Sequence, residues 1–140
     1  MAVESCRLIE LPRVDDNRGS LSFVEGGNHI PFEIARVYYL YDLPIVAERG
    51  SHAHKKLEQL IIAISGSFDV VLDDGRNKRT FHLDRPNAGL LIASMHWREL
   101  ANFTPGAVCI VLASLPYDKN DYIRNYHEFL AAVESSRKSE

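Results

Sequence analysis

The sequence predicts an all-β fold, a sandwich or barrel of short strands with one amphipathic helix at its C-terminal end. Up to residue 113, short runs of β-branched, aromatic and other apolar residues recur along the chain. Turn-forming residues separate these runs at roughly the 8–12-residue spacing typical of all-β sandwiches and barrels. After residue 120 the apolar residues recur at helical spacing instead.

Each expected strand is a short run bounded by turn signals. The segment 15–19 predicts a turn, and Asp73-Asp74-Gly75 predicts the turn of a β-hairpin. The continuously apolar run 60–64 indicates a strand that is buried on both faces. The expected strands are 6–11, 20–24, 36–41, 60–64, 68–72, 79–83, 89–93 and 107–113, and the histidines at 52 and 54 are expected on a further strand.

The C-terminal helix is expected over about residues 121–135. Asp121 is a good N-cap residue, because its side chain can accept a hydrogen bond from the first turn. The residues that would form the apolar face are Tyr122, Tyr126, Phe129, Leu130 and Val133. We therefore expect this helix to pack against the sheet.

Composition limits the possible classes of function. The 140 residues are enough for one domain, 1–140, and are 46% hydrophobic and 25% charged, as in an ordinary globular protein. The net charge of −3 gives no indication of a nucleic-acid partner. The N-terminus lacks the pattern of a signal peptide, and the longest apolar run is far too short for a membrane span. With Cys6 and Cys109 expected as free thiols, the sequence predicts a cytoplasmic protein.

The histidine pair His52 and His54 is the most informative local pattern. Side chains two residues apart on a strand point to the same face, so the two imidazoles are expected to lie together. Such a pair suggests a metal site or a proton-transfer site. The alternative is that both are surface histidines on an edge strand.

The sequence around this pair resembles the first motif of the cupin superfamily, whose members are double-stranded β-helix jelly rolls. In metal-binding cupins a carboxylate and a later histidine complete the ligand set. Here the carboxylate place falls on Gln59 and the later histidine place on Arg98. A neutral amide and a permanent cation are poor metal ligands, so no metal is expected. Glu58, after a one-residue shift in register, or His96 remained as alternative ligands.

A closer resemblance covers nearly the whole chain. The chain is similar to the dTDP-sugar 3,4-ketoisomerases, cupins that act on dTDP-4-keto-6-deoxyglucose without a metal or another cofactor. The most specific match is the string 52–59, His-Ala-His-Lys-Lys-Leu-Glu-Gln. The other matching segments are 17–20, 36–39, 49–51, 72–75, 97–100, 111–114, 117–118 and 121–126. The resemblance implies a dTDP-3-keto-6-deoxyhexose product, which is aminated and often acylated for surface polysaccharides.

The resemblance also suggests roles for individual residues. His54 is expected to act as the base on carbon and His52 as the proton shuttle between the sugar oxygens, with exchange of the two roles left open. Tyr38, Arg18 and Arg98 are candidates to stabilise the enediolate. The remaining substrate-binding candidates are Arg49 for the diphosphate, Trp97 or Tyr39 for the thymine base, and Gln59.

Other functions remain as alternatives. A dTDP-4-keto-sugar epimerase would pair one histidine with an aspartate and use a separate tyrosine, which the double-histidine string does not favour. A non-enzymatic cupin that senses a sugar nucleotide would have the same pocket but would leave the ketone of the sugar where it is. A metal-dependent dioxygenase is disfavoured by Gln59 and Arg98.

The expected assembly is a homodimer. Small cupins commonly form two-fold dimers, and pairing with a neighbour's strand protects an exposed sheet edge. The segment 6–24 is the candidate for an N-terminal element exchanged between the two copies.

Overall fold

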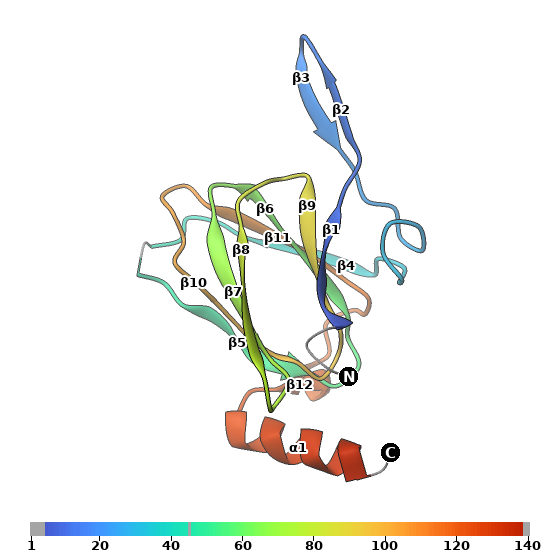
Figure 1. Ribbon diagram of the computed structural model, residues 1–140, viewed down its shortest axis with the longest axis vertical. Coiled ribbons are helices and arrows are strands. Elements are labelled where there is room, and N and C mark those ends of the chain that lie inside the picture. Colours follow the sequence, from blue (N-terminus) through green and yellow to red (C-terminus); the bar gives the residue numbers. More distant parts are fainter. Residues whose placement is uncertain (1–4, 45, 139–140) are drawn as a thin grey trace.

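A computed structural model describes residues 5–44 and 46–138, which form two facing antiparallel sheets (Figure 1). The first sheet has the order β1 (Arg7–Glu10), β9 (Ala88–Ile92), β6 (Gln59–Ser65), β11 (Val108–Ala113), β4 (Arg36–Leu40). The second has the order β12 (Tyr122–Ile123), β5 (Arg49–His54), β10 (Trp97–Ala101), β7 (Phe68–Asp73), β8 (Lys78–Leu83). With helix α1 (Tyr126–Lys138), this confirms the predicted all-β cupin jelly roll with a C-terminal helix.

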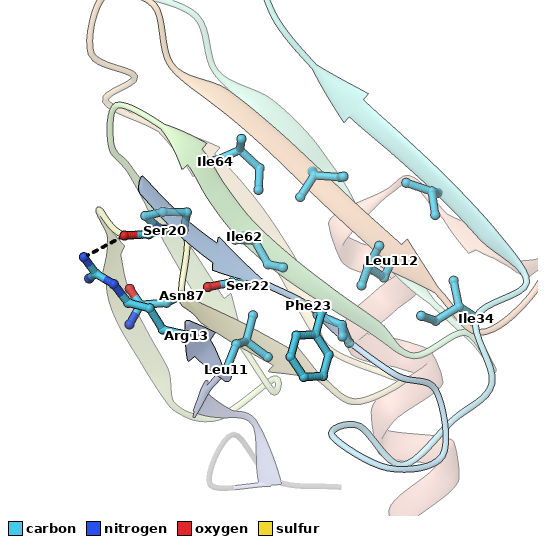
Figure 2. A pocket seen from close by; sticks show the side chains of 14 residues that line it. Leu11, Arg13, Ser20, Ser22, Phe23, Ile34, Ile62, Ile64, Asn87 and Leu112 are labelled. Atoms are coloured by element: carbon cyan, nitrogen blue, oxygen red, sulfur yellow. Dashed lines mark hydrogen bonds between the residues drawn. The ribbon is translucent and has the colours of Figure 1, made fainter. Parts of the chain in front are cut away.

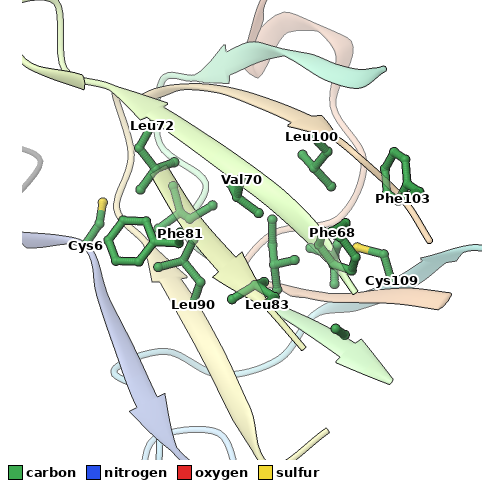
Figure 3. Close-up of a cluster of buried hydrophobic side chains, with 14 of the residues drawn as sticks. Cys6, Phe68, Val70, Leu72, Phe81, Leu83, Leu90, Leu100, Phe103 and Cys109 are labelled. Atoms are coloured by element: carbon green, nitrogen blue, oxygen red, sulfur yellow. The ribbon is translucent and has the colours of Figure 1, made fainter. Parts of the chain in front are cut away.

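The core lies between the two sheets (Figure 3). Its largest fully buried side chains include Phe68 and Leu72 from β7, Leu90 from β9 and Phe103 from the loop after β10. Strand β6 is buried on both faces, as predicted: Ile61 packs in this core, while Leu60 and Ile62 belong to a second apolar cluster on the outer face of the first sheet.

A hairpin of β2 (Arg13–Asp16) and β3 (Gly19–Ser22) extends away from the sandwich (Figure 1). The sequence predicted a strand at 20–24 after a turn, but not β2. The residues of both strands are exposed, and β2 carries charged side chains at three of its four positions, so it lacks the apolar run that marks a buried strand.

Strands β10 and β12 were also not predicted. Arg98 and Glu99 interrupt the apolar pattern of β10, although Arg98 is buried in the structure. β12 is a two-residue strand that pairs with the edge of β5, where Tyr122 lies opposite His54. Neither the buried charge nor so short a pairing leaves a periodic signal in the sequence.

The prediction that Asp121 caps the C-terminal helix was wrong. Asp121 ends a short 3₁₀ turn, and α1 begins five residues later at Tyr126. Asn125 provides the cap, because its side-chain oxygen accepts a hydrogen bond from the Glu128 backbone N–H at 3.0 Å. The helix buries Phe129 and Val133 beside Trp97 at one end of the sandwich.

Both cysteines are free and buried, in agreement with the sequence. Burial raises the pKa of the Cys109 thiol to about 12, which leaves it unreactive near neutral pH. In the part of the chain that the structure describes, no helix has the length and apolar character needed to cross a membrane.

The capping hydrogen bond gives a stability prediction. Asn125→Ala leaves the Glu128 N–H without its side-chain acceptor, so we expect the free energy of unfolding to fall by about 1 kcal/mol. Asn125→Asp keeps an acceptor oxygen and should remain within about 0.5 kcal/mol of the wild type. Urea denaturation followed by circular dichroism measures both; equal losses in the two variants would contradict the capping role.

Candidate active site

Strand β5 brings His52 and His54 to the same face, as predicted. Their ring centroids are 4.8 Å apart with perpendicular planes, and both side chains are buried. At the start of the strand, Gly50 has a positive φ of +74°. A Cβ atom at this glycine would lie 2.8 Å from a methyl group of Leu100, so glycine allows β5 to approach β10 closely.

The neighbouring strand β10 positions Arg98 directly opposite His52 in the ladder. Arg98 is 3% exposed, and its Nε donates a hydrogen bond to His52 Nε2 at 3.3 Å. Its Nη2 donates to the Tyr38 hydroxyl at 3.0 Å. Tyr38 comes from β4 of the opposite sheet, so Arg98 connects the two sheets at this point.

A cavity of about 340 Å³ opens between β4 and β5. The side chains that line it are strongly cationic: four are arginines, and no carboxylate is among the described lining residues. The full lining is Arg36, Tyr38, Leu40, Arg49, Gly50, Ser51, His52, Arg98, Tyr122 and Arg124. An arginine fork matches the oxygens of a phosphate group, so this lining suits a dianionic ligand.

The segment after β11 supplies three residues to the site that sequence reasoning missed. The Tyr122 ring packs 5.0 Å from His52 and 4.4 Å from His54, and Arg124 lies over the Tyr122 ring at 4.3 Å. Asp121 Oδ2 lies 3.2 Å from His54 Nδ1. The helical spacing of the apolar residues predicted the start of a helix at 121–126, although this segment is one of those that carry the family resemblance.

The environment lowers the pKa of both histidines. For His52, burial and the adjacent Arg98 charge lower the pKa to about 2. For His54, burial and Arg98 again lower the pKa, while Asp121 opposes them, and the result is about 4. Both imidazoles are therefore neutral at neutral pH.

The predicted site residues fall into three groups. Tyr38, Arg49, His52 and Arg98 line the cavity. His54 and Gln59 are buried just behind it: His54 packs against His52, and Gln59 Oε1 is 3.5 Å from the Tyr38 hydroxyl. Arg18 and Trp97 lie elsewhere.

Arg18 is exposed near the end of the projecting hairpin, where it pairs with Asp16. Trp97 precedes Arg98 on β10, so strand alternation turns it to the opposite face, where it packs against Tyr126 and Phe129. Tyr39, the other candidate for the base, is 60% exposed and also outside the cavity lining.

The donor set around the histidines does not fit a metal ion. His52 Nε2 accepts a hydrogen bond from Arg98, whose permanent charge would face any cation bound there. Among the described residues, no three histidine, cysteine or acidic side chains gather as a possible metal site.

Comparisons with known proteins agree with this geometry. Residues 4–134 match the family model described as "FdtA: WxcM-like, C-terminal". A curated TDP-4-oxo-6-deoxy-alpha-D-glucose-3,4-oxoisomerase from Aneurinibacillus thermoaerophilus is 44% identical over 123 residues, 88% of each chain. A 3,4-ketoisomerase structure from Helicobacter canadensis is 49% identical, covers 92% of this chain and 97% of that chain, and has a TM-score of 0.90.

A third relative was solved with a ligand. It is a histidine-to-asparagine mutant of the 3,4-ketoisomerase QdtA from Thermoanaerobacterium thermosaccharolyticum in complex with TDP-4-keto-6-deoxyglucose. It is 38% identical, covers 93% of this chain and 94% of that chain, and has a TM-score of 0.91. By contrast, the ChmJ 3'-monoepimerase from Streptomyces bikiniensis is 17% identical with a TM-score of 0.75, covers 87% of this chain and 69% of that chain, and shares the fold alone. The chain belongs to the FdtA-like family of sugar 3,4-ketoisomerases, and it is an isomerase.

Proposed function

We propose that this cavity converts dTDP-4-keto-6-deoxy-D-glucose to a dTDP-3-keto-6-deoxyhexose. The observation that carries the proposal is a pair of buried, neutral imidazoles beside a cavity lined by four arginines. The imidazoles can move protons, and the arginines can hold a diphosphate. The substrate named for the curated relative and the ligand of the QdtA mutant support this choice of sugar.

Moving the ketone from C4 to C3 requires proton transfer at both carbons. The proton on C3 is acidic because the C4 carbonyl is adjacent to it, so a base removes this proton and an enediolate forms. A proton is then delivered to C4, and the hydroxyl proton passes from O3 to O4. Every step is a proton transfer, so neutral imidazoles can carry out the sequence without an external oxidant.

We assign the carbon base to His54 and the shuttle between the two oxygens to His52. His54 Nε2 makes no hydrogen bond to the described residues, whereas His52 Nε2 already accepts one from Arg98. The free nitrogen of His54 supports its role as the base. The exchanged assignment remains the alternative, because His52 borders the cavity and His54 lies behind it.

Arg98 and Tyr38 stabilise the enediolate in this mechanism. Arg98 Nε donates a hydrogen bond to His52 and Nη2 donates one to Tyr38, while Nη1 has no partner among the described residues. That N–H group is available to a developing oxyanion. Arg49, assisted by Arg36 and Arg124, which also line the cavity, binds the diphosphate.

The product defines the next reaction. A 3-keto sugar is the substrate that an aminotransferase needs to make a 3-amino-3,6-dideoxyhexose, a class of sugar used in surface polysaccharides such as the O-antigen of lipopolysaccharide. The two free cysteines are consistent with a reducing compartment, and we place the reaction in the cytoplasm.

One observation favours an epimerase as the second candidate. An epimerase would pair one histidine with an aspartate, and the double-histidine string was expected to disfavour that activity, but His54 does pair with Asp121 in a buried contact. The presence of a histidine–aspartate pair is therefore compatible with both an epimerase and a ketoisomerase. The identities of 38–49% to ketoisomerases, against 17% to the epimerase ChmJ, favour the ketoisomerase.

We also propose that the chain forms a homodimer with an exchanged N-terminal hairpin. The outer face of the first sheet has an apolar groove of about 640 Å³, partly lined by residues of β6 and of the hairpin (Figure 2). Val14 and Leu21 on the hairpin are 56% and 58% exposed. A second copy would cover these apolar surfaces, and an exchanged hairpin would carry Arg18 toward the partner.

The isomerase activity is testable by proton NMR in deuterated buffer. We expect chelator-treated protein to convert dTDP-4-keto-6-deoxyglucose to a 3-keto product that carries deuterium. His54→Asn should abolish exchange at C3, whereas His52→Asn should retain that exchange and form little product. The reverse pattern would exchange the two roles. In the wild type, deuterium incorporation with inversion at the carbon and no movement of the ketone would identify an epimerase, and an unchanged substrate would contradict both activities.

The lowered pKa values of the ligand-free protein predict the pH dependence of kcat/KM. A histidine base is active when unprotonated, so activity is lost as the pH falls through its pKa. Because the pKa of His54 is lowered to about 4, kcat/KM should stay nearly constant from about pH 8 to about pH 6 and fall only toward pH 4. A steady-state profile, with circular dichroism at each pH as the control for folding, measures this. A half-maximal rate near pH 6.5, the value of an unperturbed imidazole, would contradict it.

Light scattering with size-exclusion chromatography tests the dimer. We expect a mass twice that of the 15.8 kDa chain at micromolar concentration. Leu21→Arg should shift the protein to the monomer, because it adds a charge to the exposed apolar surface of the hairpin. The matched control is Val46→Arg, at an exposed valine that does not line the groove. A monomeric wild type would overturn the proposal.

A further inference from the structure

Asp121 lies outside the cavity lining but in contact with a histidine of the site. Asp121 is 8% exposed. It is the last residue of the 3₁₀ turn Lys119–Asp121, immediately before β12. Its Oδ2 is 3.2 Å from His54 Nδ1. A buried carboxylate against a buried imidazole constrains which ring nitrogen carries the hydrogen.

Three donor positions converge on this carboxylate. The Lys56 backbone N–H donates to Oδ1 at 2.8 Å, and the Leu57 backbone N–H donates to Oδ2 at 3.2 Å. The third group is His54 Nδ1. An ionised carboxylate only accepts hydrogen bonds, so His54 Nδ1 must carry the hydrogen in this contact. In a neutral imidazole the lone pair is then on Nε2.

The other ring nitrogen of His54 is Nε2. It is buried and makes no hydrogen bond within the described part of the chain. His52 differs, because its Nε2 accepts a hydrogen bond from the Arg98 guanidinium. The two imidazoles therefore have different environments although they sit two residues apart on one strand.

The backbone of His54 is held without the carboxylate. Its carbonyl accepts a hydrogen bond from the Met95 N–H at 2.7 Å, and the next residue, Lys55, donates its N–H to the Asp121 carbonyl at 2.9 Å. The ladder between β5 and β12 also pairs His54 with Tyr122. The rings of His52 and Tyr122 pack against the imidazole of His54, and the side chain of Asp121 is the group that hydrogen-bonds to it.

We propose that Asp121 is a positioning residue of the isomerase: it holds His54 in the Nδ1–H tautomer and directs the unprotonated Nε2 to the reacting sugar. The role in catalysis rests on the proposed function, in which His54 is the base. Asp121 does not exchange a proton with the sugar. Its contribution is the orientation and tautomer of the ring that does.

The tautomer can be measured without any turnover. Nitrogen-15 NMR of the histidine rings distinguishes a protonated from an unprotonated Nδ1, and the spectrum of His54→Asn identifies the His54 signals. In the wild type we expect the hydrogen on Nδ1 at neutral pH. Finding the hydrogen on Nε2 would overturn the proposal, whatever the activity of the protein.

Asp121→Asn links the tautomer to the rate. The amide of this variant can donate to His54 Nδ1, which favours the Nε2–H tautomer and removes the lone pair from the reacting side. We expect kcat to fall by about 10²-fold or more, with KM within about threefold and a changed His54 spectrum. A large loss of kcat with an unchanged tautomer would assign Asp121 a structural role alone and overturn the proposal.

The chain offers a matched control. His82 and Asp69 form the same kind of contact at 2.7 Å, but outside the cavity, with His82 58% exposed. Asp69→Asn should leave kcat unchanged. If Asp121→Asn does not fold, the nitrogen-15 NMR measurement of the His54 tautomer in the wild type still tests the proposal. If the wild type has the expected tautomer but does not isomerise the sugar, the proposed function fails while the assignment of the hydrogen stands.

Discussion

The contact between Arg98 and His52 is the interaction on which the site depends. Pairing of β10 with β5 puts a permanent cation against a buried imidazole, and the guanidinium extends to Tyr38 on the opposite sheet. Burial and this charge both lower the pKa of the two histidines, so both are neutral at neutral pH. At the position where a metal-binding cupin would place a histidine ligand, this chain has an arginine, whose permanent charge disfavours a cation beside the two imidazoles.

The sandwich provides the rigidity that this arrangement requires. The side chains of the site come from β4, β5, β10 and β12, strands of both sheets whose separation is fixed by the core between them. Burial also excludes water from the imidazoles, and it contributes most to their lowered pKa values. The same low-polarity setting strengthens the contacts of Arg98 and Asp121 with the two rings.

The surface of the molecule has two contrasting regions. The cavity between β4 and β5 is cationic, whereas the groove on the outer face of the first sheet is apolar. The first is suited to an anionic sugar nucleotide and the second to another protein surface. The exposed β2–β3 hairpin belongs to the second region, yet it carries Arg18, one of the residues expected to bind substrate. A role for Arg18 at the cavity therefore depends on the proposed assembly.

The sequence by itself determined most of the strands, among them the doubly buried strand β6, because alternation and apolar runs mark them, whereas β2, β10 and β12 carry no such signal. It also determined the shared face of His52 and His54, and the family, through strand alternation and an uninterrupted motif. It also indicated Tyr38 and Arg98 through that resemblance. Only the tertiary structure decided that Arg98 bonds His52, that Trp97 faces the helix, and that Asp121 holds His54 instead of capping α1. These facts depend on which strands become neighbours and on contacts between residues 46 and 67 positions apart, and a local pattern does not encode such pairings.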